Sequence, residues 1–198
     1  MFKTFPWMSR ADRRRWRSAT TLAELGDLMA QWLEGRIASQ PGYQPNCGPD
    51  EETEPFVGLL AAANRLGWVT TCSQPGVAET GWDGAWWEQR AAVEGFVPAD
   101  GHLLRRLAAA AEAAGLLAVI HDRLDTPGTG AVPVTTRNGE IVTGFGGALS
   151  SRDLHSIWHR FPGAAAAAAA AVQFTLIDPD WGPSHRLWGV LELAAGAD

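Results

Sequence analysis

The Asn-Gly pair at positions 138 and 139 constrains the fold more than any other feature of the sequence. It stands between two short segments of strand-like composition, residues 133–137 and 140–143. Asn-Gly is the preferred centre of a type I′ turn, in which both central residues have positive φ and the chain reverses between two antiparallel strands. The sequence therefore predicts a β-hairpin at this point.

Three other segments are apolar enough to be core strands. Residues 116–121 form a continuous apolar run, of the kind that is buried on both faces of a sheet. Residues 68–71 predict a short, buried and central strand, and residues 173–178 predict a last core strand. Residues 85–93 favour a further strand, while their Glu, Gln, Arg and Ala leave a helix open as the alternative.

Helices are indicated by capping residues and by apolar spacing. Thr21 with Glu24, and Ser150 with Asp153, have the spacing of a capping box, in which two side chains bind the free backbone N–H groups at a helix start. Residues 39–52, rich in Pro and Gly and ending in an acidic cluster, indicate a loop. The predicted helices cover residues 9–17, 21–34, 54–66, 101–114, 150–161 and 164–171.

The composition is that of one globular domain. The chain has 198 residues, of which 46% are hydrophobic and 19% are charged, and this length suits a single domain with a substantial core. We expect an α/β or α+β fold: a single domain with a mixed sheet of about five strands, a central hairpin, and helices packed on the faces of the sheet. Residues 1–20 are expected to form an N-terminal extension and basic helix, and residues 21–198 the globular domain.

Several classes of protein are excluded by simple counts. No apolar run approaches the roughly 18 residues of a membrane span, and the N-terminus lacks the pattern of a secretory signal, so we expect a soluble, cytoplasmic protein. Cys47 and Cys72, the only cysteines, are too few for a disulfide framework or a structural zinc site. His155 and His159 stand four residues apart without a third ligand nearby. We therefore expect neither a metal nor another cofactor.

The segment that follows residues 68–71 is the leading candidate for a binding site. The chain leaves a buried strand into a polar turn, and such strand ends commonly build ligand sites. Polar and flat aromatic groups then lie close together in the sequence, the composition of a small-molecule pocket. We expect a soluble binding protein for a small polar ligand, nucleotide-like ligands included; the alternative is that the tryptophans serve the core alone. The candidate residues are Thr71, Ser73, Gln74, Trp82, Asp83, Trp86, Gln89 and Arg90.

A thiol-dependent enzyme is the second hypothesis. Cys72 follows one predicted strand and His121 ends another. If these two strands are adjacent and parallel, both side chains emerge at the same edge, as a Cys–His hydrolase or transferase requires. The alternative is that Cys72 is a small buried residue without chemistry.

The basic helix supports a third hypothesis, an interaction protein. Arg10, Arg13, Arg14 and Arg17 recur at three- and four-residue intervals and can share one face. An anionic partner could bind this face, although the net charge of −6 argues against nucleic-acid affinity for the protein as a whole. The alternative is a solvated helix that forms salt bridges with the acidic remainder of the chain.

Five stretches of the sequence form a distinctive set: MSRADRRRW (8–16), WLEG (32–35), NRLGWVT (64–70), SQPG (73–76) and WEQRAAV (87–93). In these stretches the chain resembles an uncharacterised family of streptomycete proteins. The resemblance covers most of the chain and implies an actinobacterial, cytoplasmic protein. It implies no activity and therefore assigns no catalytic residue. It also suggests Met8 as the usual start, with residues 1–7 as an extension.

Overall fold

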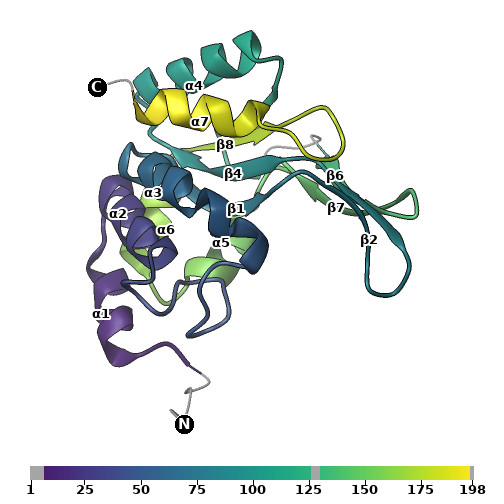
Figure 1. Ribbon diagram of the computed structural model, residues 1–198. Coiled ribbons are helices and arrows are strands. Elements are labelled where there is room, and N and C mark those ends of the chain that lie inside the picture. The colour runs from purple at the N-terminus through teal and green to yellow at the C-terminus, as the bar shows by residue number, and fades with distance from the viewer. Residues whose placement is uncertain (1–6, 126–129, 197–198) are drawn as a thin grey trace.

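The computed structural model describes residues 7–125 and 130–196 and has an α+β fold (Figure 1). The helices are α1 (Arg10–Ser18), α2 (Leu22–Leu33), the 3-10 helix η1 (Glu51–Phe56), α3 (Val57–Arg65), α4 (His102–Ala113), α5 (Ser151–Trp158), α6 (Pro162–Ala169) and α7 (Arg186–Ala195). The strands are β1 (Val69–Gln74), β2 (Val77–Thr80), β3 (Trp86–Gln89), β4 (Ala92–Val97), β5 (Leu117–His121), β6 (Val132–Arg137), β7 (Glu140–Phe145) and β8 (Val172–Ile177).

Both predicted capping boxes are confirmed. Thr21 Oγ1 accepts a hydrogen bond from Glu24 N, and the Glu24 carboxylate accepts one from Thr21 N. Ser150 and Asp153 exchange the same two bonds at the start of α5. Each box satisfies backbone donors that have no partner within the helix. The local sequence therefore fixes where α2 and α5 begin.

The first sheet is the centre of the molecule. Its strand order is β1-β4-β8-β5, and every neighbouring pair is antiparallel. Figure 1 shows α4 and α7 along one side of this sheet, α1, α2, α5 and α6 gathered on the other, and α3 beside β1. All six residues of β8 are buried, and Phe174 packs edge-on against Trp68 with ring centroids 5.3 Å apart. The main hydrophobic core lies between this sheet and its helices.

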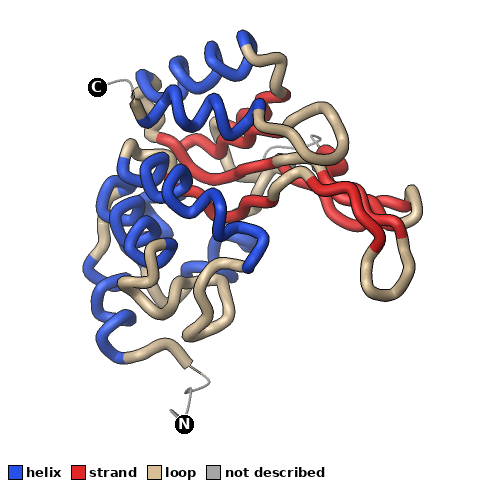
Figure 2. Tube along the Cα trace, viewed as in Figure 1, coloured by secondary structure: helices blue, strands red, loops and turns tan. Residues whose placement is uncertain are grey.

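The second sheet extends away from the helices, as the strands in Figure 2 show. Its order is β2-β3-β6-β7, again antiparallel throughout. The predicted hairpin is confirmed as β6 and β7, and its turn has positive φ at both Asn138 (51°) and Gly139 (81°). Because few helices cover this sheet, most of its strand residues lie partly or fully at the surface.

The α+β class is confirmed, and the single mixed sheet of about five strands is corrected. In the described residues the strands divide between two antiparallel sheets of four. The physical reason lies at Arg90 and Ala91, where the chain leaves β3 of the second sheet and enters β4 of the first. Residues 85–93, expected as one strand, therefore belong to two sheets.

Two strands expected in the interior lie at sheet edges instead. Residues 68–71 were expected as a central strand followed by a turn, but β1 runs on to Gln74 and is an edge strand. The run at 116–121 does form a strand, yet β5 is the opposite edge, and Leu117 and Ile120 are 42% and 45% exposed. Apolar composition does not by itself distinguish an edge strand from a central strand.

None of the helices in residues 7–125 and 130–196 is long and apolar enough to cross a membrane.

Candidate functional site

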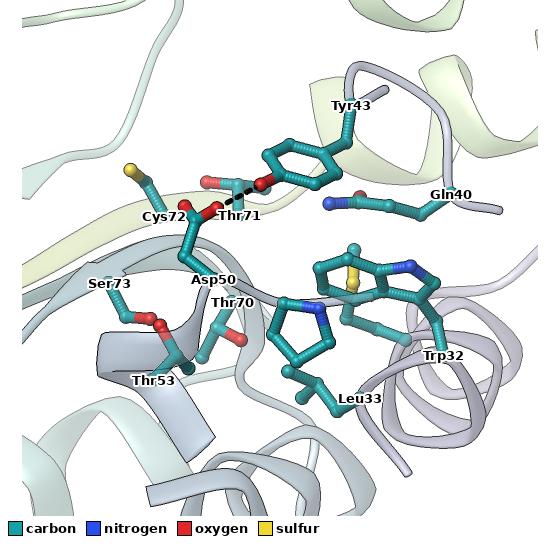
Figure 3. A pocket seen from close by; sticks show the side chains of 12 residues that line it. Trp32, Leu33, Gln40, Tyr43, Asp50, Thr53, Thr70, Thr71, Cys72 and Ser73 are labelled. Carbon is teal, nitrogen blue, oxygen red and sulfur yellow. Dashed lines mark hydrogen bonds between the residues drawn. The ribbon is translucent and has the colours of Figure 1, made fainter. Parts of the chain in front are cut away.

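A cavity of about 110 Å³ lies beside the free edge of β1 (Figure 3). Four parts of the chain enclose it: the C-terminal half of α2, the loop that follows α2, the 3-10 helix η1, and β1 itself. The volume has room for several water molecules or a small ligand, and is below the 300–1,000 Å³ typical of drug-sized ligands. We call it the β1 cavity. Its lining residues are Met29, Trp32, Leu33, Gln40, Tyr43, Pro49, Asp50, Thr53, Thr70, Thr71, Cys72 and Ser73.

Two buried indoles hold the loop over the strand. Trp16 Nε1 donates to Ser39 O at 2.8 Å, and Trp32 Nε1 donates to Cys47 O at 3.0 Å. The loop also closes on itself, because Asn46 N donates to Ser39 Oγ at 2.8 Å. Hydrogen bonds from buried donors to loop carbonyls satisfy both groups and fix the loop path. These hydrogen bonds therefore hold the loop that covers the cavity against α1 and α2.

Tyr43 and Asp50 form a polar pair at the mouth of the cavity. The Tyr43 hydroxyl donates to the Asp50 carboxylate, as the dashed line in Figure 3 shows, and Asp50 itself is exposed. This bond, with partial burial and the negative charge of Asp50, raises the pKa of Tyr43 to about 12. The Tyr43 ring also packs edge-on against Trp32, with centroids 5.7 Å apart. At neutral pH Tyr43 is therefore a protonated donor that orients the carboxylate.

The surroundings of the β1 cavity are electronegative. Burial, together with repulsion from Asp50 and Glu79, raises the pKa of nearby Glu52. None of the lining residues within the described chain is Lys, Arg or His. A carboxylate without a neighbouring cation favours ligands that carry a positive charge or hydrogen-bond donors, and disfavours anions.

Cys72 lies at the rim of the cavity, on the exposed surface of β1. Figure 3 shows its sulfur pointing away from Tyr43 and Asp50. The atoms packed around the thiol, and then the carboxylate of Glu94 on the neighbouring strand, raise its pKa to about 11. The pKa of Glu94 is itself raised by burial, although Gly146 N donates to this carboxylate at 3.0 Å. The thiol is therefore protonated at neutral pH.

The structure does not bring Cys72 and His121 together. Their strands, β1 and β5, are opposite edges of the first sheet, separated by β4 and β8. The three antiparallel pairings also make these two strands run in opposite directions. The adjacent, parallel arrangement that a thiol–imidazole pair needs is therefore absent. His121 is buried, and its Nε2 lies 2.8 Å from Gly146 O.

The predicted ligand-binding residues fall into separate places. Thr71 and Ser73 line the β1 cavity, as does Cys72. Gln74 is buried between the two sheets: its amide Nε2 donates to Arg90 O at 2.8 Å and to Val134 O at 2.9 Å. These bonds join β1 to the second sheet, so Gln74 acts as a structural link.

The remaining candidates lie along the second sheet, away from the cavity. Trp82 is fully exposed in the β2–β3 turn, and Trp86 is 44% exposed at the start of β3. Asp83, in the same turn, accepts a hydrogen bond from Arg137 at 2.5 Å. Gln89 ends β3, and the Arg90 guanidinium lies 4.2 Å from the ring centroid of Trp181. The structure does not gather these side chains into one hollow with Thr71 and Ser73.

The sequence reasoning missed the loop side of the cavity, above all Tyr43 and Asp50. The Pro- and Gly-rich composition of residues 39–52 indicated a loop, and no local pattern indicates which strand that loop covers. The available signal was indirect. Trp16 and Trp32 lie on predicted helices, and a buried indole N–H usually finds a hydrogen-bond acceptor.

The described fold is an α+β protein with two antiparallel sheets and a small polar cavity at a strand edge. Residues 11–196 match the model of a family described as a domain of unknown function, DUF6919, and the chain belongs to this family. The match spans most of the chain and confirms the resemblance to an uncharacterised family. The chain matches none of the curated proteins with which it was compared.

Proposed function

We propose that this protein binds a small polar ligand with a positive charge or hydrogen-bond donors in the β1 cavity. The observation that carries the proposal is the Tyr43–Asp50 pair at the mouth of a hollow that has no cationic lining residue in the described chain. The carboxylate provides the counter-charge for the ligand, and Tyr43 holds it in place. Trp32 and Tyr43 supply aromatic surface, which attracts cations as well as apolar groups.

Hydroxyl and amide groups complete the recognition surface. Thr71 and Ser73 face the cavity from β1, Gln40 does so from the loop, and Thr53 from η1. These groups orient a ligand without adding charge. A phosphate would meet the Asp50 carboxylate here and no guanidinium or ammonium group, which argues against a nucleotide-like ligand in this cavity.

The thiol-dependent alternative finds less support. The pKa of the Cys72 thiol is raised, whereas a reactive cysteine needs a lowered one. His121 lies across the sheet from it. We therefore favour binding over covalent chemistry at this strand.

A thermal-shift screen tests the proposal. The panel contains small aliphatic amines and amino alcohols, each paired with a carboxylate of matched size. A ligand at 100 times its Kd stabilises the folded state by about 2.7 kcal/mol, which raises Tm by roughly 5–10 °C for a chain of this length. We expect such shifts with amines and none with the matched carboxylates.

Two variants decide where a stabilising amine binds. Asp50→Asn removes the counter-charge and keeps the shape, so the shift should disappear. Glu51→Gln makes the same change on the next residue, which is exposed and does not line the cavity, so the shift should remain. The proposal fails if no amine stabilises the protein, or if both variants lose the shift equally.

A further inference from the structure

A second hollow, which borders the same loop as the β1 cavity at Gln40 and Tyr43, is lined by arginines. It lies between the start of α1, the loop at residues 40–46 and the C-terminal end of α5. Two adjoining parts, of about 310 and 720 Å³, share Trp7, Met8, Arg13 and Arg160. We call it the arginine groove. Its distinguishing residues are Trp7, Arg10, Arg13, His159 and Arg160.

The charged side chains that line the groove are positive. Arg10, Arg13 and Arg160 line it, and no Asp or Glu does so within the described residues. This is unusual in a chain whose net charge is −6. Other arginines of the described chain form ion pairs, namely Arg15, Arg36, Arg65, Arg137 and Arg186. The described residues contain no ion pair that involves a groove arginine.

Rigid elements hold these arginines in place. The buried rings of Trp16 on α1 and Trp158 on α5 pack edge-on, with centroids 6.2 Å apart. This contact fixes the two helices relative to each other and therefore brings Arg13 close to the end of α5. Arg13 Nη2 also donates to Met8 O at 3.2 Å, and Arg160 Nε donates to His159 Nε2 at 3.3 Å. The backbone segments that carry these arginines are therefore fixed relative to each other by the packing of α1 against α5.

We propose that the arginine groove binds a small organic phosphate. Planar guanidinium groups match phosphate oxygens in charge and in hydrogen-bond geometry. Three of them converge here from two separate parts of the chain. Trp7, which is 59% exposed and lines both parts of the groove, packs against the organic portion of the ligand. The volume is that of a small-molecule site, and the acidic remainder of the protein disfavours an extended polyanion.

Calorimetric titration with ADP tests this inference on the full chain. Wild-type protein should bind ADP, and adenosine, which lacks the phosphates, should bind at least about tenfold more weakly. Arg10→Ala combined with Arg160→Ala should weaken ADP binding about tenfold or more. Both residues are exposed, so this variant should fold normally.

The matched control is Arg14→Ala combined with Arg17→Ala. It removes the same charge from exposed positions that do not line the groove, and it should change ADP affinity less than about threefold. The proposal is overturned if both double variants weaken binding equally, if adenosine binds as tightly as ADP, or if ADP does not bind. Tighter binding of a ten-nucleotide oligothymidylate than of ADP would also overturn it, in favour of nucleic acid. Asp50→Asn should leave ADP binding unchanged, which separates this site from the β1 cavity.

Discussion

At the scale of single residues, the Tyr43–Asp50 pair determines the chemistry of the β1 cavity. Tyr43 is the only tyrosine of the chain, and its hydrogen bond to Asp50 raises its pKa to about 12. A group whose pKa is raised in the folded state stabilises that state below the pKa of the unfolded chain. The contribution of Tyr43 is therefore complete below about pH 10 and is lost as the pH rises toward 12.

The single tyrosine allows a direct optical test. Phenolate absorbance in the folded protein should appear with a midpoint near pH 12. In Asp50→Asn, which lacks the acceptor charge, the midpoint should fall toward the ordinary value of about 10. Equal midpoints in the two proteins would show that the pair does not form in solution. Circular dichroism at each pH should show that both proteins are still folded when the midpoints are read.

The second residue-scale prediction concerns the Cys72 thiol. A rise of the Cys72 pKa from 9.0 to about 11 lowers the thiolate fraction at pH 7.5 roughly 100-fold, and the higher intrinsic reactivity of a more basic thiolate offsets about tenfold of this. In a Cys47→Ser background, iodoacetamide should therefore modify Cys72 about tenfold more slowly than a free thiol. Glu94→Gln should speed the reaction, because it removes the repelling carboxylate. Modification of Cys72 as fast as a free thiol would restore the enzyme hypothesis.

At the scale of elements, burial depends on where a strand lies in its sheet. β5 and β8 are neighbouring strands with similarly apolar sequences, and Ile120 stands directly opposite Phe174. Phe174 is fully buried, while Ile120 is 45% exposed because β5 has no strand on its outer side. Ile120 and Phe174 therefore contribute differently to the free energy of unfolding, although they are paired in the sheet.

Alanine substitutions at this register position should show the difference. Phe174→Ala should lower the free energy of unfolding by about 3–5 kcal/mol, through lost burial and the cavity left behind. Ile120→Ala should lower it by about 1 kcal/mol or less, because much of the side chain is already in water. Urea unfolding of both variants makes the comparison. A loss of several kcal/mol for Ile120→Ala would mean that another surface covers β5 in solution.

Local elements could be predicted from the sequence, and long-range placement could not. Thr21 and Asn138 act within a few residues of themselves, so a capping box and a turn can be recognised from short patterns. The order of strands in a sheet depends on contacts between distant segments, and for this reason the edge positions of β1 and β5 were not foreseen. The same holds for the candidate site, where Thr71 and Ser73 were predicted and Tyr43 and Asp50, which reach β1 through the loop, were not.

At the scale of the whole molecule, one loop borders two hollows whose lining residues carry opposite charge. Gln40 and Tyr43 border both the β1 cavity and the arginine groove. The cavity has carboxylates at its mouth and nearby, while the groove has guanidinium groups and no carboxylate among its described lining residues. Buried indoles tie this loop to α1 and α2. The α+β scaffold therefore keeps the electronegative β1 cavity apart from the electropositive arginine groove.

The most direct test of the central claim is a ¹H–¹⁵N spectrum of the indole N–H groups, recorded while an amine identified in the thermal screen is added. Substitution of Trp32 and of Trp82 by Phe assigns their signals. The Trp32 signal should move in a saturable way, because this ring lines the β1 cavity, and the Trp82 signal, at the exposed β2–β3 turn, should stay in place. A ligand that stabilises the protein and shifts Trp82 while leaving Trp32 unmoved would contradict binding in the β1 cavity.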